Sequence, residues 1–177
     1  MQRVRDRWRR TRTGLVVPVP TGRWWSPVEP TGVPGGTVRE VDPADLVGLR
    51  RAVLRDGRAD LPASYPWDSE PSTLHLGLVT PGEQVVGCVT VRVDPWPGFA
   101  SLHLVLMAVD ASWRRRGVGR ALVGTVQESA TAAGLDVWAA ARTGALDFYR
   151  ELGFTPAGDV FVAAMDLPHR RVLWRHS

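Results

Sequence analysis

The residues with the clearest chemical meaning form the loop 113–123, WRRRGVGRALV, which is rich in arginine and glycine. It joins an apolar, strand-like segment at 102–109 to a helical pattern that ends near Gly134. Gly117 and Gly119 have no side chains, so the backbone can bend there and approach a ligand closely. The first turn of the helix that follows has unpaired N–H groups at its positive end, which favour anions. The loop is therefore a candidate pyrophosphate cradle.

Together with a second segment, this loop carries a family resemblance. Arg114-x-x-Gly117-x-Gly119 resembles the acetyl-coenzyme A loop of the GCN5-related N-acetyltransferases (GNAT), and ALDFYRELGF at 145–154 resembles that family's A-x-x-F-Y-x-x-L-G-F segment. The resemblance covers about 37–174. It implies one α+β domain whose mixed, mostly antiparallel twisted sheet has six to seven strands, is flanked by about four helices and parts at its two central strands.

The resemblance also implies acetyl-coenzyme A as co-substrate. Its site would comprise the end of the central strand and the loop, namely Met107, Ala108, Val109, Arg114, Arg115, Arg116, Gly117, Val118, Gly119 and Arg120. We expect the main chain of 107–109 to bind the pantetheine arm, because the strands part there. Arg142 stands where some members carry asparagine, and it could meet an anion of the cofactor or of the substrate.

Tyr149 matches the tyrosine that many members use as a general acid toward the leaving thiolate. Its ordinary pKa of about 10 makes it a proton donor at neutral pH. The alternative is a core aromatic residue that packs beside Phe148.

The candidate base is His103, six residues before Val109, where members often place a glutamate or a histidine. Strand alternation predicts that it shares a face with Val105, Met107 and Val109. A pKa of about 6.5 suits a base at physiological pH, although a half-buried structural histidine would fit the same position.

His75 and His169 are alternative bases, since each is predicted to lie on a strand or at the start of one. No two candidate ligands have the spacing of a metal site, so we expect none.

The acceptor is expected to be a small-molecule amine or a peptide amine. The loop 56–70 is predicted to line the amine side, and its acids could attract a cation: Asp56, Asp60, Asp68 and Glu70. Val137 stands where protein N-terminal acetyltransferases carry a glutamate, which weakens the case for a ribosomal-protein type of substrate.

Composition separates the first 36 residues from the rest. They hold seven arginines and two acids among several prolines, whereas 37–177 hold 15 arginines and 16 acids. We therefore predict a disordered basic extension at 1–36 and an acetyltransferase domain at 37–177. A nucleic-acid partner is a lesser alternative for the extension, and a homodimer is left open.

The chain length suits one domain, and one cysteine, Cys88, fits a reducing compartment, so we expect a cytoplasmic protein. No apolar run is long enough to span a membrane. The expected elements are strands at 37–41, 73–79, 84–94, 101–109, 135–141 and 170–175, a weak strand after Phe154, and helices from Asp42 to Gly57, from 118 to 134 and up to Gly153.

Taken together, these features predict an N-acetyltransferase that moves the acetyl group of acetyl-coenzyme A to a primary amine in a ternary complex. The alternative is a catalytically weak module that binds acyl-coenzyme A as a sensor.

Overall fold

The computed structural model describes residues 7–10, 16–19, 32–94, 96, 97 and 99–176. The strands are β1 (Arg7–Arg10), β2 (Val16–Val19), β3 (Thr37–Glu40), β4 (Thr73–Val79), β5 (Val85–Val93), β6 (Ser101–Val109), β7 (Asp136–Arg142), β8 (Thr155–Val162) and β9 (Pro168–Trp174). The α-helices are α1 (Pro43–Leu54), α2 (Val118–Ala133) and α3 (Leu146–Glu151), and the short 3-10 helices are η1 (Pro66–Ser69), η2 (Ala111–Trp113), η3 (Thr143–Ala145) and η4 (Ala164–Asp166).

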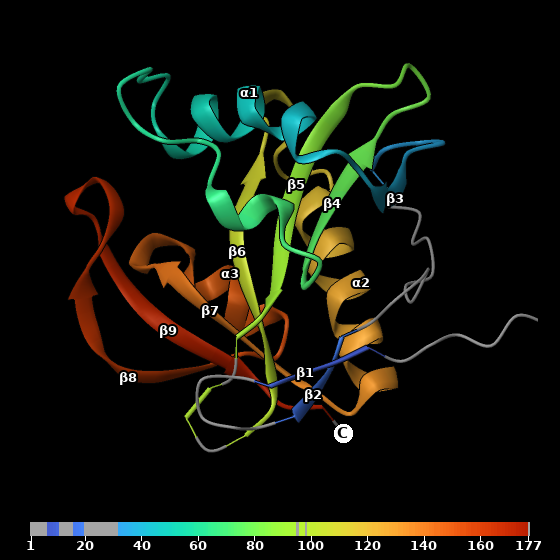
Figure 1. Ribbon diagram of the computed structural model, residues 1–177. Coiled ribbons are helices and arrows are strands. Elements are labelled where there is room, and N and C mark those ends of the chain that lie inside the picture. The colour runs from blue at the N-terminus through green and yellow to red at the C-terminus, as the bar shows by residue number, and fades with distance from the viewer. Residues whose placement is uncertain (1–6, 11–15, 20–31, 95, 98, 177) are drawn as a thin grey trace, which may run out of the picture.

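Seven strands form one mixed sheet in the order β3-β4-β5-β6-β7-β9-β8 (Figure 1). Neighbouring strands are antiparallel except β6 and β7, which are parallel and are connected through α2. The predicted α+β architecture is confirmed. The described residues contain three α-helices and four short 3-10 helices, where about four helices were expected.

The central strands β6 and β7 pair over only four residues, from Ser101 opposite Asp136 to Leu104 opposite Ala139. Beyond that point β6 continues with β5 on its other side, and β7 continues with β9. The edge of β6 that faces β7 is therefore unpaired from Val105 onward, as the family resemblance predicts, and Figure 1 shows the two strands diverging.

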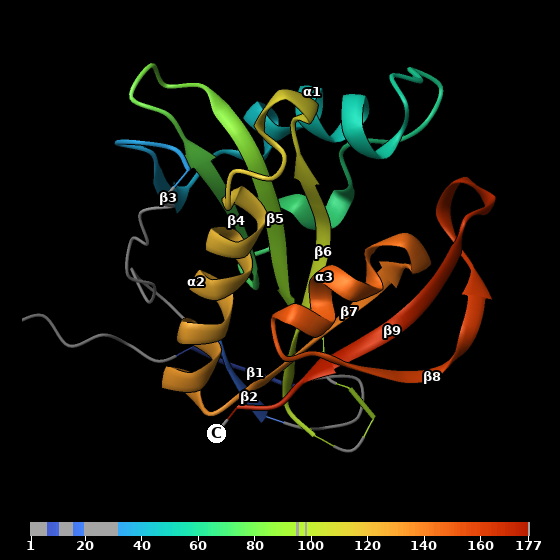
Figure 2. The same cartoon turned by 180° about the vertical axis from the view of Figure 1, so that it is seen from behind.

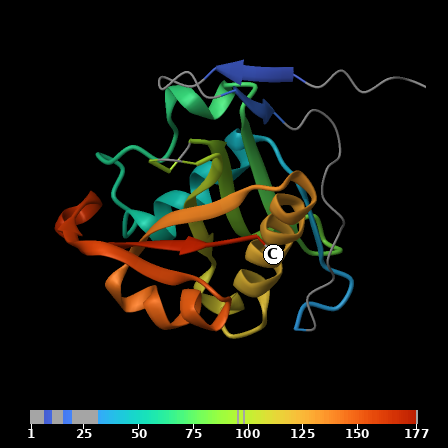
Figure 3. The ribbon, with the colours of Figure 1, turned by 90° about the horizontal axis from the view of Figure 1, so that it is seen from below.

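The helices cover opposite faces of the sheet. α2 and α3 lie on the face seen in Figure 2, and α1 and η1 lie on the face seen in Figure 1. The apolar stripe of α2 packs into the main core, where Val118, Leu122 and Val126 are at most 1 % exposed. A smaller core of Leu46, Cys88 and Ala108 lies under α1. Figure 3 shows α3 beside β8.

A bulge in β6 breaks the side-chain alternation expected from the sequence. The register with β5 shifts between Cys88 and Thr90, and Leu106 has a φ of 50°. Met107 and Val109 consequently pack against the α2 core. The expectation that they share a face with His103 was wrong, because an inserted residue reverses the direction of every side chain after it.

Two residues before the expected domain start at Thr37 already pack against the rest of the chain. Val33 is 2 % exposed and belongs to the main core. At Gly32 the backbone passes so close to the loop before α2 that a Cβ would lie 2.3 Å from the Arg116 carbonyl oxygen.

The segment predicted to be disordered also contains β1 and β2, which pair antiparallel with each other. Apart from 32–36, its other residues lie outside the described part of the chain, so the division at residue 36 remains a prediction.

In the part of the chain that the structure describes, no helix is long and apolar enough to cross a membrane. The same residues contain no group of three or more acidic, histidine or cysteine side chains arranged to hold a metal ion.

Candidate active site

A cavity of about 460 Å³ opens where β6 and β7 part. Its walls come from β6, β7, the end of α1, α3 and the turn between β8 and β9. Seven predicted site residues line it: His103, Met107, Ala108, Val109, Arg114, Arg142 and Tyr149. The remaining predicted residues, 115–120, belong to the loop and the first turn of α2 and are not among the lining residues.

The loop before α2 has the geometry of an anion cradle. Gly117 adopts a left-handed conformation with a φ of 78°, and no side chain caps the helix that begins at Val118. The first N–H groups of α2 are therefore open to a ligand. A Cβ at Gly119 would lie 2.9 Å from Met107 Cε and 3.2 Å from Phe148 Cζ, so a side chain there would have to displace the ends of both side chains. The unpaired edge of β6 and this cradle fit an elongated ligand with a phosphate end.

The four arginines of the loop play different structural parts. Arg114 lines the cavity and donates from Nε to the Val109 carbonyl oxygen at 3.4 Å. Arg116 lies over the Trp113 ring, and Arg120 pairs with Glu151 on the surface. Arg115 has a φ of 62°, which leaves the loop tightly curved there. Of these four loop arginines, only Arg114 lines the cavity.

Tyr149 is 6 % exposed, and its ring packs edge-on against Phe148 and Phe154. Its hydroxyl donates to the sulfur of Met107 at 3.7 Å, so it reaches the β6 segment expected to hold the cofactor. Burial raises the pKa of Tyr149 well above its ordinary value. The phenol therefore keeps its proton at neutral pH, as a general acid must.

His103 is held by two neighbours. Its Nδ1 lies 3.1 Å from Asp94 Oδ2, and its ring stacks on Trp138 with centroids 3.5 Å apart. Trp138 in turn donates from Nε1 to the Asp94 carbonyl oxygen at 2.7 Å, so the three residues fix one another. The other ring nitrogen, Nε2, is buried and has no hydrogen-bond partner within the described chain. A buried polar atom of this kind is costly unless a ligand supplies the missing partner.

The electrostatics favour a neutral imidazole. Burial lowers the pKa of His103 below 6.5, and the hydrogen bond and charge of Asp94 offset part of that effect. The hydrogen bond from His103 in turn lowers the pKa of Asp94, which stays ionised. An ionised carboxylate at Nδ1 selects the tautomer that carries its proton there, so Nε2 has a free lone pair and can accept a proton.

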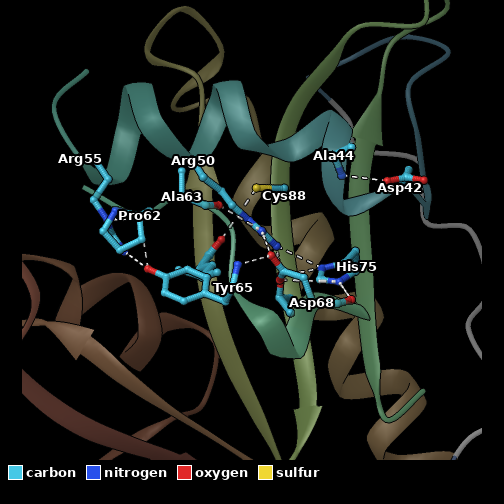
Figure 4. Close-up of polar contacts among 12 residues, drawn as sticks. Asp42, Ala44, Arg50, Arg55, Pro62, Ala63, Tyr65, Asp68, His75 and Cys88 are labelled. Carbon is cyan, nitrogen blue, oxygen red and sulfur yellow. Dashed lines mark hydrogen bonds and ion pairs between the residues drawn. The ribbon is translucent and has the colours of Figure 1, made fainter. Parts of the chain in front are cut away.

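The other two candidate bases, His75 and His169, differ in their position relative to the cavity. His75 lies outside the cavity in a buried network, where Nε2 bonds the Asp68 carbonyl oxygen and Nδ1 contacts Arg50 and Thr90 (Figure 4). Both of its nitrogens are occupied, so it cannot serve as the base. His169 lines the cavity, and its Nδ1 lies 2.8 Å from the Leu167 carbonyl oxygen.

The acids of the loop 56–70 do not line the cavity. Asp68 is 7 % exposed and pairs with Arg50 at 2.9 Å, which ties η1 to α1 and the sheet (Figure 4). Asp60 pairs with Arg58 on the surface. The expectation that this loop lines the amine side finds no support in the cavity wall, which in this region includes only Val53, Leu54 and Arg55.

Asp94 and Trp138 contact His103 in the candidate site, and the sequence reasoning missed both. In the sequence, Asp94 is the first residue of a predicted turn. Its distance from His103 along the chain does not indicate that the two side chains interact. The pairing of Arg92 with His103 and of Val93 with Leu102 follows from folding 85–109 into a hairpin. That register would have placed Asp94 close to His103.

The comparisons with known proteins agree with this geometry. A family profile described as "Acetyltransferase (GNAT) family" matches residues 46–154. A search of curated proteins by sequence found no match.

Several solved structures share the fold. ElaA of Escherichia coli is 17% identical and superposes with a TM-score of 0.66 over 78% of this chain and 99% of its own. An acyl-CoA N-acyltransferase of Pseudomonas aeruginosa is 19% identical, with a TM-score of 0.65 over 78% and 99%. An aminoglycoside 6'-N-acetyltransferase complexed with coenzyme A is 17% identical, with a TM-score of 0.63 over 78% and 96%. The parted strands, the loop before α2 and the matching profile agree, and the chain belongs to the GNAT family of acyltransferases.

Proposed function

We propose that the chain is an N-acetyltransferase that transfers the acetyl group of acetyl-coenzyme A to a primary amine, which attacks directly in a ternary complex. The observation that carries this proposal is the unpartnered Nε2 of His103, backed by Asp94, on the wall of the cavity that Tyr149 also lines. A module that only senses acyl-coenzyme A has no need of a base fixed by a carboxylate.

The residues present fit the cofactor. The open N–H groups at the start of α2 and the side chain of Arg114 would hold its phosphates, and the free edge of β6 at Met107–Val109 would bind the pantetheine amides. When bound, acetyl-coenzyme A supplies an activated acetyl thioester. Holding it beside an amine in one cavity contributes much of the rate enhancement.

Two side chains move protons in this scheme. His103 Nε2 accepts the proton of the amine, and its Nδ1–H stays bonded to Asp94, which stabilises the imidazolium. Tyr149 retains its phenolic proton through burial and can donate it on the cofactor side. The two residues thus divide the roles of base and acid.

The test is a panel of amines, polyamines, amino acids and peptides with acetyl-coenzyme A and a free-thiol readout. We expect turnover with at least one acceptor. Tyr149→Phe keeps the ring packing and removes only the hydroxyl, so it should lower turnover about 10²-fold with little change in cofactor affinity. His103→Gln should also lower turnover. Cofactor binding without turnover on any acceptor would instead identify a sensor.

A further inference from the structure

The permanently charged side chains on the cavity wall are all arginines. They are Arg55, Arg114 and Arg142, and the wall also includes two histidines, His103 and His169. No aspartate or glutamate of the described chain lines the cavity. An amine acceptor that is itself a polycation would therefore meet three arginines and no carboxylate on the wall.

These side chains differ in how many of their hydrogen-bond donors already have partners within the protein. Arg55 uses all three guanidinium nitrogens, which donate to the Pro62 and Leu54 carbonyl oxygens and to the hydroxyl of Tyr65. Arg142 makes one bond, from Nη2 to the Leu54 carbonyl oxygen at 3.1 Å, and pairs with no carboxylate in the described part of the chain. Its guanidinium is half-buried and electrostatically uncompensated.

Strand geometry places Arg142 on the face of the sheet that carries His103. Along β7, Val137, Ala139 and Ala141 pack into the α2 core, so Trp138 and Arg142 point to the opposite face. Trp138 stacks on His103 there. Arg142 is thus on the acceptor side of the parted strands.

His169 stands directly opposite Arg142 in the register of β9 with β7, so both side chains reach the same end of the cavity. Its Nδ1–H donates to the Leu167 carbonyl oxygen, which leaves Nε2 as the atom available to a ligand.

Two further arginines strengthen the positive field on this face. Arg92 is the register partner of His103 and lies over the Trp67 ring, and Arg171 lies over the Phe161 ring. Within the described residues neither of them forms an ion pair, although the carboxylate of Asp94 beside His103 offsets part of the field of Arg92.

We propose that the acceptor is an amine that also bears a carboxylate, as an amino acid does, and that Arg142, which lies opposite His169, binds this carboxylate. This inference rests on the proposed acetyl transfer and specifies its substrate class. A guanidinium presents two parallel N–H donors that match the two oxygens of a carboxylate, which orients the amine as well as binding it.

The cofactor's phosphates are the other source of anions for Arg142. They are expected at the start of α2, which covers the opposite face of the sheet from α1, and Arg142 reaches the end of α1. The experiment therefore measures cofactor affinity separately from acceptor preference.

The test compares each of the twenty amino acids with its carboxamide as acceptor, using acetyl-coenzyme A and free-thiol release. For the best acceptor we expect kcat/KM of the acid to exceed that of the amide about ten- to a hundredfold, the size of a charge-assisted hydrogen bond. Amides or polyamines that react better than every acid would overturn the inference and leave acetyl transfer standing. No reaction with any amine, despite cofactor binding, would overturn both.

Variants locate the preference. Arg142→Gln should bring the ratio of acid to amide close to one and leave the dissociation constant of coenzyme A, measured by calorimetry, unchanged. Arg142→Lys keeps the positive charge but lacks the two parallel N–H donors of the guanidinium. It should therefore keep part of the preference for the acid over the amide.

Arg170→Gln is the matched control. Arg170 neighbours Arg171 on β9 and donates to the Gly158 carbonyl oxygen outside the cavity, so its loss should leave the ratio as in the parent. A loss of cofactor affinity in Arg142→Gln with an unchanged ratio would assign Arg142 to the cofactor and refute the inference.

Discussion

At the scale of single residues, the site depends on how His103 is held. A histidine on a strand is often only a packed ring, and burial alone would make it a poor partner for any proton. Asp94 changes this, because it bonds Nδ1 and leaves Nε2 without a partner in the described chain, so that Nε2 is the atom proposed to accept the proton. Trp138 holds both residues in place, because its ring stacks on His103 and its Nε1 donates to the Asp94 carbonyl oxygen. Asp94 does not line the cavity, so in the proposed mechanism it positions His103 and does not touch the acceptor.

Asp94→Asn tests this role. Asparagine can still accept a bond from Nδ1–H, but it lacks the charge that raises the pKa of His103 against burial. The pKa of the base should therefore fall, and the acidic limb of the profile of kcat/KM against pH should move to lower pH. A weaker base should also reduce turnover at neutral pH about tenfold. A purely structural loss would lower the rate and leave the limb in place.

The control for that substitution is Asp147→Asn, which removes an exposed carboxylate paired with Arg150 on α3. This variant should have the same turnover as the parent protein and the same acidic limb in the profile of kcat/KM against pH. If Asp94→Asn and Asp147→Asn give the same profile, then Asp94 does not tune the base.

At the scale of elements, sequence patterns located most of the fold. The strand at 101–109 and the helix between Gly117 and Gly134 occur where they were predicted, because glycine and alternation mark them locally. The bulge near Leu106 was not predictable, since it arises from the register between β5 and β6 and not from either segment alone. For the same reason Met107 was assigned to the wrong face of the sheet, although it lines the cavity.

The segment before β3 shows a second limit of local patterns. Proline and glycine around Val33 predict an unfolded extension, yet Val33 is buried in the main core and Gly32 touches the loop before α2. Burial of a single valine depends on a distant surface that composition does not reveal.

Truncated chains test how much the residues before Thr37 contribute to stability. A chain that starts at Gly32 should keep the melting temperature of the full chain, whereas a chain that starts at Thr37 loses Val33 and should be less stable. In the full chain, Val33→Ala should lower the free energy of unfolding by about 1.5–3 kcal/mol, from the lost methyl groups and the cavity they leave. Denaturant unfolding measures both effects. Equal stability of the two truncated chains would show that the packing of Val33 contributes little.

At the scale of the whole molecule, the sheet has two halves that meet only over four residues of β6 and β7. One half contains β3 to β6 with α1 packed on β5 and β6, and the other contains β7, β9 and β8 with α3 packed on β8 and β9. A ligand between the parted strands contacts both halves at once. Binding should therefore stabilise the entire fold and not a single loop.

The most direct test of this account is the melting temperature with and without acetyl-coenzyme A. At a hundredfold excess over its dissociation constant the ligand adds about 2.7 kcal/mol of stability. For a chain of this size that corresponds to a rise of about 5–10 °C.

Gly119→Asp should abolish the rise, because it places bulk and negative charge beside Met107 and Phe148 in the cradle. Gly48→Asp on α1, where a Cβ meets nothing within 4 Å, should retain it. A parent protein whose melting temperature does not change at millimolar acetyl-coenzyme A would contradict the account.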